Sequence, residues 1–405
     1  MPSDPPDAST AAGDWPAVAA EVVEWTPTLS PDLLTRAQRA RYRGPYEAAV
    51  VPFITGATPV LHPSTSALVA DASQVITRFD AELGHEVAPF AAILLRSESA
   101  SSSRIENLSS GAKQIALAQL GSTAKRNATV IVGNVAAMTA AIDLAETLGA
   151  RSVLAIHRAL IEHQNPEIAG RWRSDQVWVG GSSVGPHDAE FVAPVAARVP
   201  ELIDDLVAFM SRLDMSPLVT AAIAHAQFET IHPFPDGNGR TGRALVQSML
   251  RGHGLTRNVT VPVSAGLLSD TEHYFGTLDA YRSGDVTPIV EIMATAAISA
   301  THQATQLVSE LRNVRARWDD VVRARRGSAA RRLLDVVLRQ PVVDTRTVAT
   351  ALDISPTNAG RAITPLVDAG VLQEFTGFNR NRMWQANDVL GALDDFAARA
   401  ARRGP

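Results

Sequence analysis

The residues best suited to chemistry lie in one short stretch, HPFPDGNGRTGR. A predicted helix directly follows Gly237, Asn238 and Gly239. Glycine adopts the unusual backbone angles that point consecutive amides inward, and a helix N-terminus adds partial positive charge. Arg240 and Arg243 are three residues apart, so they share one face of this helix. The stretch therefore predicts a site for a polyphosphate, which needs several donors and bidentate pairing.

Two further side chains complete a reactive set in the same stretch. Asp236 precedes the glycines, and a carboxylate oxygen beside phosphates is the usual protein ligand of Mg²⁺. His232 is the only obvious general base, because a neutral imidazole can take a hydroxyl proton near pH 7. Each residue alone is more often structural, as a helix end, a turn or a solvated face. Their occurrence together within twelve residues favours the functional interpretation.

The composition narrows the classes of chemistry and of partner. The chain has 405 residues and no cysteine, which excludes a thiol nucleophile, cysteine-based zinc sites and iron–sulfur clusters. Its length and its 46% of hydrophobic residues predict two or three globular domains. A net charge of −5 offers nucleic acid no overall attraction, so any such binding must be local. The absence of a secretory signal and of a long apolar run predicts a cytoplasmic protein that does not enter a membrane.

Apolar residues at helical spacing predict a mainly helical protein around this stretch. The expected helices are 87–108, 110–120, 127–148, 152–162, 199–213, 217–231, 240–253, 271–283 and 287–326. One extended segment near 48–54 and one short hairpin near 171–181 interrupt them. The expected domains are a disordered lead-in at 1–30, an N-terminal helical region at 31–125, a core at 126–326 and a C-terminal block at 327–405.

The stretch matches every defined position of the Fic (filamentation induced by cAMP) signature, His-Pro-Phe-x-Asp/Glu-Gly-Asn-Gly-Arg-x-x-Arg. The chain resembles this family over roughly residues 31–300. The resemblance implies a Fic-type helical core that transfers AMP from ATP, or sometimes another nucleotide part, to a hydroxyl of a target protein. Gly239 stands where the phosphotransferase members of the family have lysine, which favours nucleotidyl transfer.

The resemblance also implies a role for each residue of the stretch. His232 would deprotonate the incoming hydroxyl, and Asp236 would hold Mg²⁺. Arg240 and Arg243 would hold the β- and γ-phosphates of ATP. The remaining phosphate-binding residues would be Gly237, Asn238 and Gly239.

A second match to the family lies upstream, in SESASSSRIENLSS. Ser102 and Glu106 are four residues apart, hence on one helix face. The segment from Ser102 to Asn107 fits the motif Ser/Thr-x-x-x-Glu-Gly/Asn of Fic proteins whose inhibitor precedes the core. The resemblance implies that Glu106 pairs with Arg243 and keeps that arginine from the γ-phosphate of ATP. Without the loop signature, the exposed end of a serine-rich helix would be the better interpretation.

Two further assignments come from the same resemblance. The hairpin with Val177, Trp178 and Val179 resembles the flap that holds a target segment by strand addition. Its alternative is an ordinary apolar hairpin packed on the core. Tyr274 lies in the helix that usually walls the adenine pocket, although aromatic residues at helical spacing are more often core.

From Ser328 onward the pattern predicts three short helices and two short strands, and it resembles a winged helix-turn-helix. Ser355 would cap the third helix and the wing would turn around Gly377. In a DNA-reading form this helix would enter the major groove. Eight acidic residues in the block leave a slight positive excess, so docking to protein or dimerisation is an equal alternative. The candidate DNA contacts are Thr357, Asn358, Arg361, Arg380 and Arg382.

The leading hypothesis is a self-restrained protein adenylyltransferase. It would use ATP and Mg²⁺ to modify a Ser, Thr or Tyr hydroxyl on a target protein or on its own chain. One alternative is removal of AMP, with Glu106 orienting a water molecule. The other is a DNA-binding transcriptional regulator whose nucleotide site only senses ATP. The sequence leaves the oligomeric state open between a monomer and a homodimer, although family members with this layout often form dimers.

Overall fold

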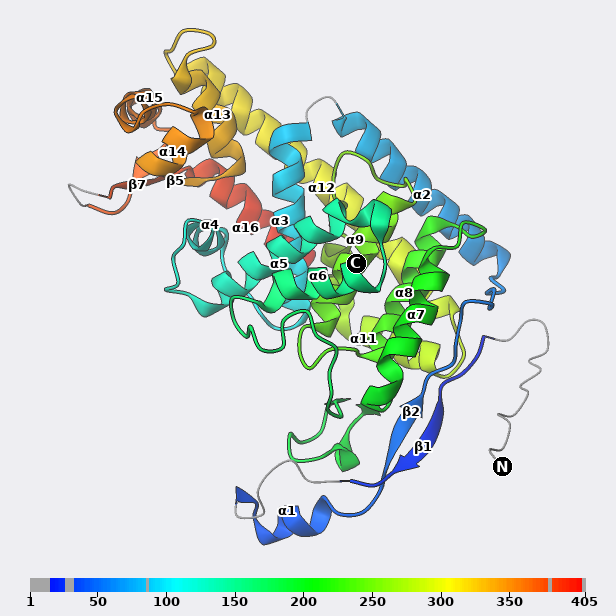
Figure 1. The fold of residues 1–405 in the computed structure, drawn as a ribbon. Coiled ribbons are helices and arrows are strands. Elements are labelled where there is room, and N and C mark those ends of the chain that lie inside the picture. Colours follow the sequence, from blue (N-terminus) through cyan, green and yellow to red (C-terminus); the bar gives the residue numbers. More distant parts are fainter. Residues whose placement is uncertain (1–14, 26–32, 85–86, 378–380, 403–405) are drawn as a thin grey trace.

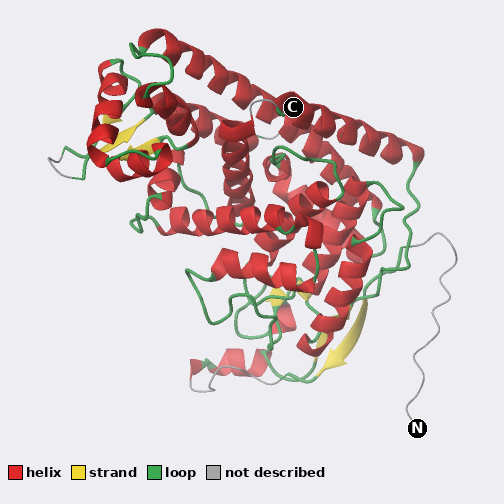
Figure 2. Cartoon of the chain, turned by 45° about the horizontal axis from the view of Figure 1, so that its top comes forward, coloured by secondary structure: helices red, strands yellow, loops and turns green. Residues whose placement is uncertain are grey.

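The structure is a computed structural model that describes residues 15–25, 33–84, 87–377 and 381–402. Helices dominate these residues and the strands are short (Figure 2). The expected mainly helical fold class is therefore confirmed. In the part of the chain described, no helix is long and apolar enough to cross a membrane.

Two helices lie at the centre of the core, α8 (Pro217–Ile231) and α9 (Asn238–Gly252), and they pack against each other (Figure 1). α8 is buried on all sides, because small and apolar residues occur all round it. A proline lies in its first turn, where a backbone N–H would have no hydrogen-bond partner within the helix, and its fixed φ angle favours the helix start. The surrounding helices are α2 (Pro63–Leu83), α5 (Arg126–Asp143), α6 (Ala150–Ile161), α7 (Val199–Met210), α10 (Val263–Leu267) and α11 (Thr271–Arg282).

The longest helix, α12 (Thr287–Val321), has 35 residues and joins the core to the C-terminal block. It packs against α2, α8, α10 and α11 within the core. The helix ends before the expected residue 326, because Val322 adopts an extended backbone. One helix thus contacts both halves of the molecule.

Among its described residues, 327–377 and 381–402, the C-terminal block contains four helices and three strands, so the expected three helices and two strands are wrong in number. The strands form one sheet in the order β5-β7-β6. Helix, strand, helix, helix, strand, strand is the order of a winged helix-turn-helix, an assignment that stays a prediction, as do the domain boundaries. The elements are α13 (Ala329–Arg339), β5 (Val342–Asp344), α14 (Thr345–Leu352), α15 (Pro356–Asp368), β6 (Gln373–Glu374), β7 (Met383–Gln385) and α16 (Asn387–Ala400).

The residues expected to read DNA differ in their surroundings. Thr357, Asn358 and Arg361 are exposed on α15, which Ser355 caps as expected. Arg382 forms an ion pair of 2.7 Å with Glu374, and its guanidinium also lies over the Trp384 ring. Its charge is therefore already partly neutralised within the block. Arg380 lies outside the described residues.

Helix α3 (Val87–Ile105) runs through the middle of the molecule, and polar residues on several of its sides are buried. The side-chain amide of Asn134 on α5 donates to the carbonyl of Ser99 at 2.8 Å. Ser264 of α10 donates its hydroxyl to Glu98 at 2.6 Å. The helix ends at Ile105 rather than at 108, because Asn107 adopts the left-handed conformation that terminates helices.

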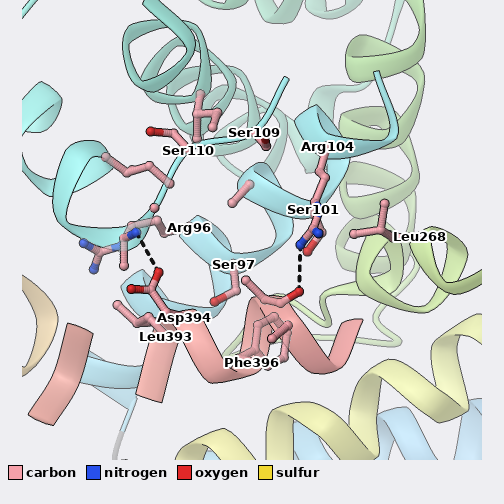
Figure 3. A pocket seen from close by; sticks show the side chains of 17 residues that line it. Arg96, Ser97, Ser101, Arg104, Ser109, Ser110, Leu268, Leu393, Asp394 and Phe396 are labelled. Atoms are coloured by element: carbon pink, nitrogen blue, oxygen red, sulfur yellow. Dashed lines mark hydrogen bonds between the residues drawn. The ribbon is translucent and has the colours of Figure 1, made fainter. Parts of the chain in front are cut away.

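Two arginines of α3 reach the C-terminal block. Arg104 donates from Nη1 to the carbonyl of Ala397 in α16 at 2.8 Å (Figure 3). Arg96 donates from Nη2 to the carbonyl of Arg339, the last residue of α13. A cation near a helix C-terminus satisfies open carbonyls and is favoured by the helix dipole. These contacts fix α3 to the block as well as to the core.

An antiparallel pair of strands near the N-terminus corrects one expectation. β1 (Ala19–Val23) pairs with β2 (Tyr46–Val50), and Trp15 is buried. The disordered lead-in expected at 1–30 is therefore wrong for residues 15–25, whereas residues 1–14 lie outside the described residues. The extended segment expected at 48–54 is β2, which ends earlier.

The second pair of strands corrects the expected hairpin. β3 (Trp178–Val179) pairs with β4 (Phe191–Val192), so the partner strand lies beyond the expected limit at residue 181. Gly180 and Gly181 both adopt positive φ angles, of 75° and 68°, which turn the chain out of β3. The glycines mark the end of a strand and the start of a long connection.

Candidate active site

The loop between α8 and α9 is held in shape by its own residues. His232 ends α8 in the left-handed region, with φ 50° and ψ 60°. The backbone amide of Phe234 donates to Asn238 Oδ1 at 2.9 Å, and Asn238 Nδ2 donates back to the Phe234 carbonyl at 2.8 Å. The binding of phosphate by Asn238 stays a prediction, and in this structure its side chain is engaged with Phe234. That side chain closes the loop, and its backbone amide opens α9.

Two residues that the sequence did not single out hold the loop from outside. His157 of α6 stacks on Phe234, with ring centroids 3.7 Å apart. Because Gly170 donates to its Nδ1 at 3.1 Å, the proton lies on Nε2, which donates to the carbonyl of Asp236 at 3.0 Å. Arg173 donates from Nε to the carbonyl of His232 at 2.8 Å. Their acceptors on the loop are backbone carbonyls, which every residue carries, so no sequence pattern could reveal these contacts.

The imidazole of His232 is oriented as a base. Its Nδ1 lies 3.2 Å from the carbonyl of Glu229, so Nδ1 carries the proton and Nε2 is left as the acceptor. Burial lowers the pKa of His232 to about 4. The Glu229 carbonyl and Glu106 oppose this effect, whereas Arg173 and Arg282 add to it. The side chain is therefore neutral at pH 7, the form that can accept a proton.

Asp236 lies at the mouth of the loop with 68% of its side chain exposed. Its Oδ1 accepts the backbone amide of Gly237 at 2.6 Å and lies 3.4 Å from Nη2 of Arg240. An exposed carboxylate with a second oxygen facing solvent suits Mg²⁺, which proteins hold through one or two carboxylates together with substrate phosphates. Among the residues described, no group of three or more His, Cys, Asp or Glu side chains could hold a metal ion, and the role of Asp236 as an Mg²⁺ ligand stays a prediction.

The start of α9 presents donors that lack partners. Gly237 has φ 79°, the left-handed conformation that lets the amides at the helix start face one side. Arg240 is 5% exposed, and its Nε and Nη1 have no hydrogen-bond partner within the described parts of the chain. Buried donors are normally satisfied, so an anion at this position would complete them. Burial also lowers the pKa of Arg240.

Arg243 is buried one helical turn further on, and its donors are occupied by Ser102 of α3 and by Glu106, which directly follows that helix. Its Nη2 lies 2.7 Å from Glu106 Oε1 and 2.8 Å from the carbonyl of Ser102. Its Nε donates to the Ser102 hydroxyl at 3.0 Å. Burial works against both charges, but mutual attraction outweighs it, so the pKa of Glu106 is lowered and that of Arg243 is raised. The structure thus brings together the two motifs that lie far apart in the sequence.

Glu106 also covers the loop between α8 and α9. A Cβ atom added at Gly239 would clash with Glu106 Oε1. The carboxylate therefore rests directly against the glycine-rich start of α9, where an anion would otherwise bind. Glycine is required at this position for that close approach.

Tyr274 is in the core rather than on a pocket wall. It is 1% exposed, its hydroxyl lies 2.6 Å from His225 Nε2, and its ring stacks on that histidine. The expectation that Tyr274 walls an adenine pocket is therefore wrong, because the ring has no open face. The neighbouring Phe275 is 47% exposed and is the aromatic ring that this helix offers to solvent.

The three residues expected in the flap face different surroundings. Trp178 packs edge-on against Trp25, with centroids 5.7 Å apart, and donates to the Ser182 carbonyl. The carbonyl of Val177 accepts the amide of Ala193. Val179 is 39% exposed, and its contact with a target protein stays a prediction. The packing of Trp178 agrees with the alternative of an ordinary apolar hairpin for that residue.

Comparison with known proteins agrees with this geometry. Residues 147–250 match the model of the Fic/DOC family. "Protein adenylyltransferase fic-1" of Caenorhabditis elegans is 32% identical over 142 residues, which cover 35% of this chain and 26% of that protein. "Protein adenylyltransferase Fic" of Nematostella vectensis is 30% identical over 159 residues, which cover 38% of this chain and 33% of that protein. The matched region thus spans about a quarter to a third of these relatives' own length.

A solved structure shares the fold over most of the chain. A Fic family protein from Desulfovibrio desulfuricans G20 superposes with a TM-score of 0.52 and 24% identity. The superposition covers 81% of this chain and 97% of that one. The likeness therefore extends well beyond the family match, into the helices that flank it. Residues 147–250 of this chain are thus similar to the Fic/DOC family.

Proposed function

We propose that the protein transfers AMP from ATP to a hydroxyl side chain of a target protein, or of its own chain. The observation that carries this proposal is the loop between α8 and α9, which presents a neutral base and an unsatisfied buried guanidinium together. His232 offers a free Nε2, and Arg240 offers two donors without partners. The names of the relatives support AMP transfer over AMP removal and over a purely regulatory role.

The proposed reaction needs little covalent chemistry from the protein. The amides at the start of α9 and the guanidinium of Arg240 would bind the phosphates of ATP and stabilise negative charge. Asp236 would hold Mg²⁺, which supplies positive charge to the phosphates when bound. His232 Nε2 would accept the proton of a Ser, Thr or Tyr hydroxyl. As the hydroxyl oxygen bonds to the α-phosphorus, the bond to the β-phosphate breaks and pyrophosphate leaves.

In the proposed resting state α3 blocks this reaction. Glu106 and Ser102 occupy the donors of Arg243 that the γ-phosphate would need. The carboxylate of Glu106 also lies against Gly239, where it repels an incoming phosphate. Productive ATP binding would therefore require Glu106 to leave. Both the blocking contact and its release depend on the same ion pair.

The test follows the phosphorus that is transferred. Purified full-length protein is incubated with ATP labelled at the α- or the γ-phosphate, with and without a cell lysate. Label from the α position alone supports AMP transfer, whereas label from the γ position identifies a kinase. The His232→Ala variant should transfer neither label. Equal α-labelling by wild type and His232→Ala would overturn the proposal.

A further inference from the structure

A second group of arginines surrounds a cavity of about 510 Å³ away from the candidate active site. Arg96 belongs to α3, Arg251 to α9 and Arg339 to α13, so the cavity lies where these three helices meet. No Asp or Glu lines it. Amides and hydroxyls provide its remaining polar lining: Gln119, Gln340, Asn258, Thr139 and Thr260.

Arg96 is a buried cation without a counter-charge. The residue is 6% exposed, and its guanidinium donates to Gln119 Oε1 at 3.1 Å and to the carbonyl of Arg339. Within the described ranges its Nε has no partner. Burial lowers the pKa of Arg96 to about 10, and no carboxylate raises it again. Proteins rarely keep such a charge unless something compensates it.

The positive charge around the cavity is only partly balanced. None of the three guanidiniums forms an ion pair with a described carboxylate, and Arg251 donates to the carbonyl of Arg257. Four helices end nearby, α4 (Ala112–Gln119), α5, α9 and α13, and each C-terminus contributes roughly half a negative charge. About one of the three positive charges therefore remains. The cavity is an electropositive hollow with donors at its wall.

We propose that this cavity binds a phosphate monoester, whose phosphate contacts Arg96, Arg251 and Arg339. A tetrahedral dianion can accept from several guanidiniums at once, which no single carboxylate can do as well. The cavity is larger than a phosphate ion, and Leu95, Val135 and Val259 give it an apolar wall for a carbon portion. It has no aromatic lining residue on which a nucleotide base could stack. A small phosphorylated metabolite therefore fits better than a nucleotide.

The position of the cavity gives binding a regulatory consequence, which rests on the proposed function. Arg96 lies on α3 ten residues before Glu106, which directly follows that helix, and Arg251 follows Arg243 by eight residues on α9, distances of about 15 and 12 Å at the helical rise. A bound phosphate would thus join the same two helices that the Glu106 and Arg243 pair joins. Since a ligand stabilises the arrangement that it bridges, binding strengthens inhibition.

Direct binding is measured first, by calorimetry on the full-length protein. The probes are phenyl phosphate and inorganic phosphate, with benzyl alcohol as the uncharged control. Phenyl phosphate should bind more tightly than inorganic phosphate, and benzyl alcohol should not bind. Tighter binding of inorganic phosphate would identify the free ion as the ligand and overturn the monoester assignment. Absence of binding by both anions would overturn the site.

Variants separate this cavity from the loop at the start of α9, which also attracts anions. Arg251→Gln should weaken phenyl phosphate binding at least tenfold, whereas Arg240→Gln should leave it within twofold. Arg257→Gln, an exposed arginine next to the site, controls for general charge and should also leave it unchanged. Thermal melting verifies that each variant is folded. Loss of binding in Arg240→Gln alone, or equal loss in Arg257→Gln, would overturn the assignment.

The coupling is then tested through the α-label transfer assay. Phenyl phosphate should lower labelling by the wild type several-fold and should leave the Glu106→Gly variant unaffected. Binding with unchanged wild-type labelling would overturn the coupling. If transfer occurs without phenyl phosphate binding, the cavity proposal fails and the proposed function stands. If binding occurs in a protein that transfers no AMP, the proposed function fails and the site stands.

Discussion

Glu106 Oε1 and Arg243 Nη2 lie 2.7 Å apart although 137 positions separate them in the sequence. Glu106 is 37% exposed on its side chain and Arg243 only 2%, so the pair lies at the boundary between solvent and core. Such a pair can stabilise a resting conformation, and because Glu106 is partly exposed, the two side chains can also separate.

Replacing Glu106 by Gly should raise AMP transfer. A hydrogen bond to a charged group contributes about 1.5–3 kcal/mol, which corresponds to a factor of about 10 to 100 in an equilibrium. Because water weakens the half-exposed pair, we expect the lower part of this range. The rate of α-label incorporation measures this increase in AMP transfer. Glu106→Gln, which loses the charge but keeps an acceptor, should show a smaller rise, and unchanged labelling by Glu106→Gly would remove the inhibitory role.

Replacing Arg243 by Ala should reduce transfer by about 100-fold or more, since a buried donor to the transferring phosphates would be lost. Arg243→Lys keeps the charge but not the planar fork, so it should recover only part of the rate. The double variant Glu106→Gly with Arg243→Ala should be as slow as Arg243→Ala. A fast double variant would show that Arg243 serves only to anchor α3.

The rate of AMP transfer should fall only in strongly acidic solution, because the pKa of the base His232 is unusually low. His232 acts when it is neutral, and burial lowers its pKa to about 4, so protonation occurs only in more acidic solution than for an exposed histidine. In the Glu106→Gly background, kcat/KM should stay nearly flat from pH 7 to 5 and fall as pH approaches 4. Circular dichroism over the same range separates this fall from unfolding. A midpoint near 6.5 would contradict the buried environment of this imidazole.

Asn238→Ala should destabilise the protein and slow transfer together. The substitution removes both bonds that close the loop on Phe234 and leaves two buried backbone groups unsatisfied. We expect a loss of about 1–3 kcal/mol in the free energy of unfolding, measured by denaturant titration. Asn127→Ala, which removes a single bond to the Ser109 carbonyl, is the matched control and should cost less.

Arg173→Met should lower kcat more than it changes KM for ATP. The substitution keeps most of the side-chain volume but removes the donor that holds the His232 carbonyl. His232 would then lose its fixed position while the phosphate-binding residues keep theirs, and misplacement of a base slows the chemical step. Arg171→Met, in the same connection, provides the control. A change confined to KM would place Arg173 in nucleotide binding instead.

The active-site loop could be predicted from the sequence because its reactive residues are neighbours in the chain. The base, the carboxylate, the glycines and the arginines all lie between the end of α8 and the first turns of α9. The partner of Arg243 could be predicted only by resemblance, since nothing local to Glu106 indicates which arginine it meets. His157 and Arg173 were missed because their acceptors on the loop are carbonyls. Tyr274 was misassigned because helical spacing cannot distinguish a buried ring from one that lines a pocket.

The strands were predicted less well than the helices for a related reason. β1 is five residues long, with burial that alternates between half-buried and exposed, beside residues rich in proline and alanine. The strand conformation of β1 depends on its pairing with β2, a contact that the local sequence pattern does not show. The partner of β3 lies beyond a long connection, and two adjacent glycines in that connection suggested a hairpin limit that was too early. The local sequence pattern therefore could not predict the pairing of strands that lie far apart in the chain.

Because α12 is long, a small change in its tilt displaces its far end by several ångströms. At 1.5 Å per residue its 35 residues form a rod of about 50 Å, so a tilt of about 5° at one end displaces the other by about 4 Å. One end lies against the core helices and the other against α13 and α16, whose C-terminal carbonyls are held by arginines of α3. A displacement of that size exceeds the length of the ion pair between Glu106 and Arg243. A tilt of α12 would therefore be transmitted to α13 and α16 and, through Arg96 and Arg104, to α3, which ends directly before Glu106.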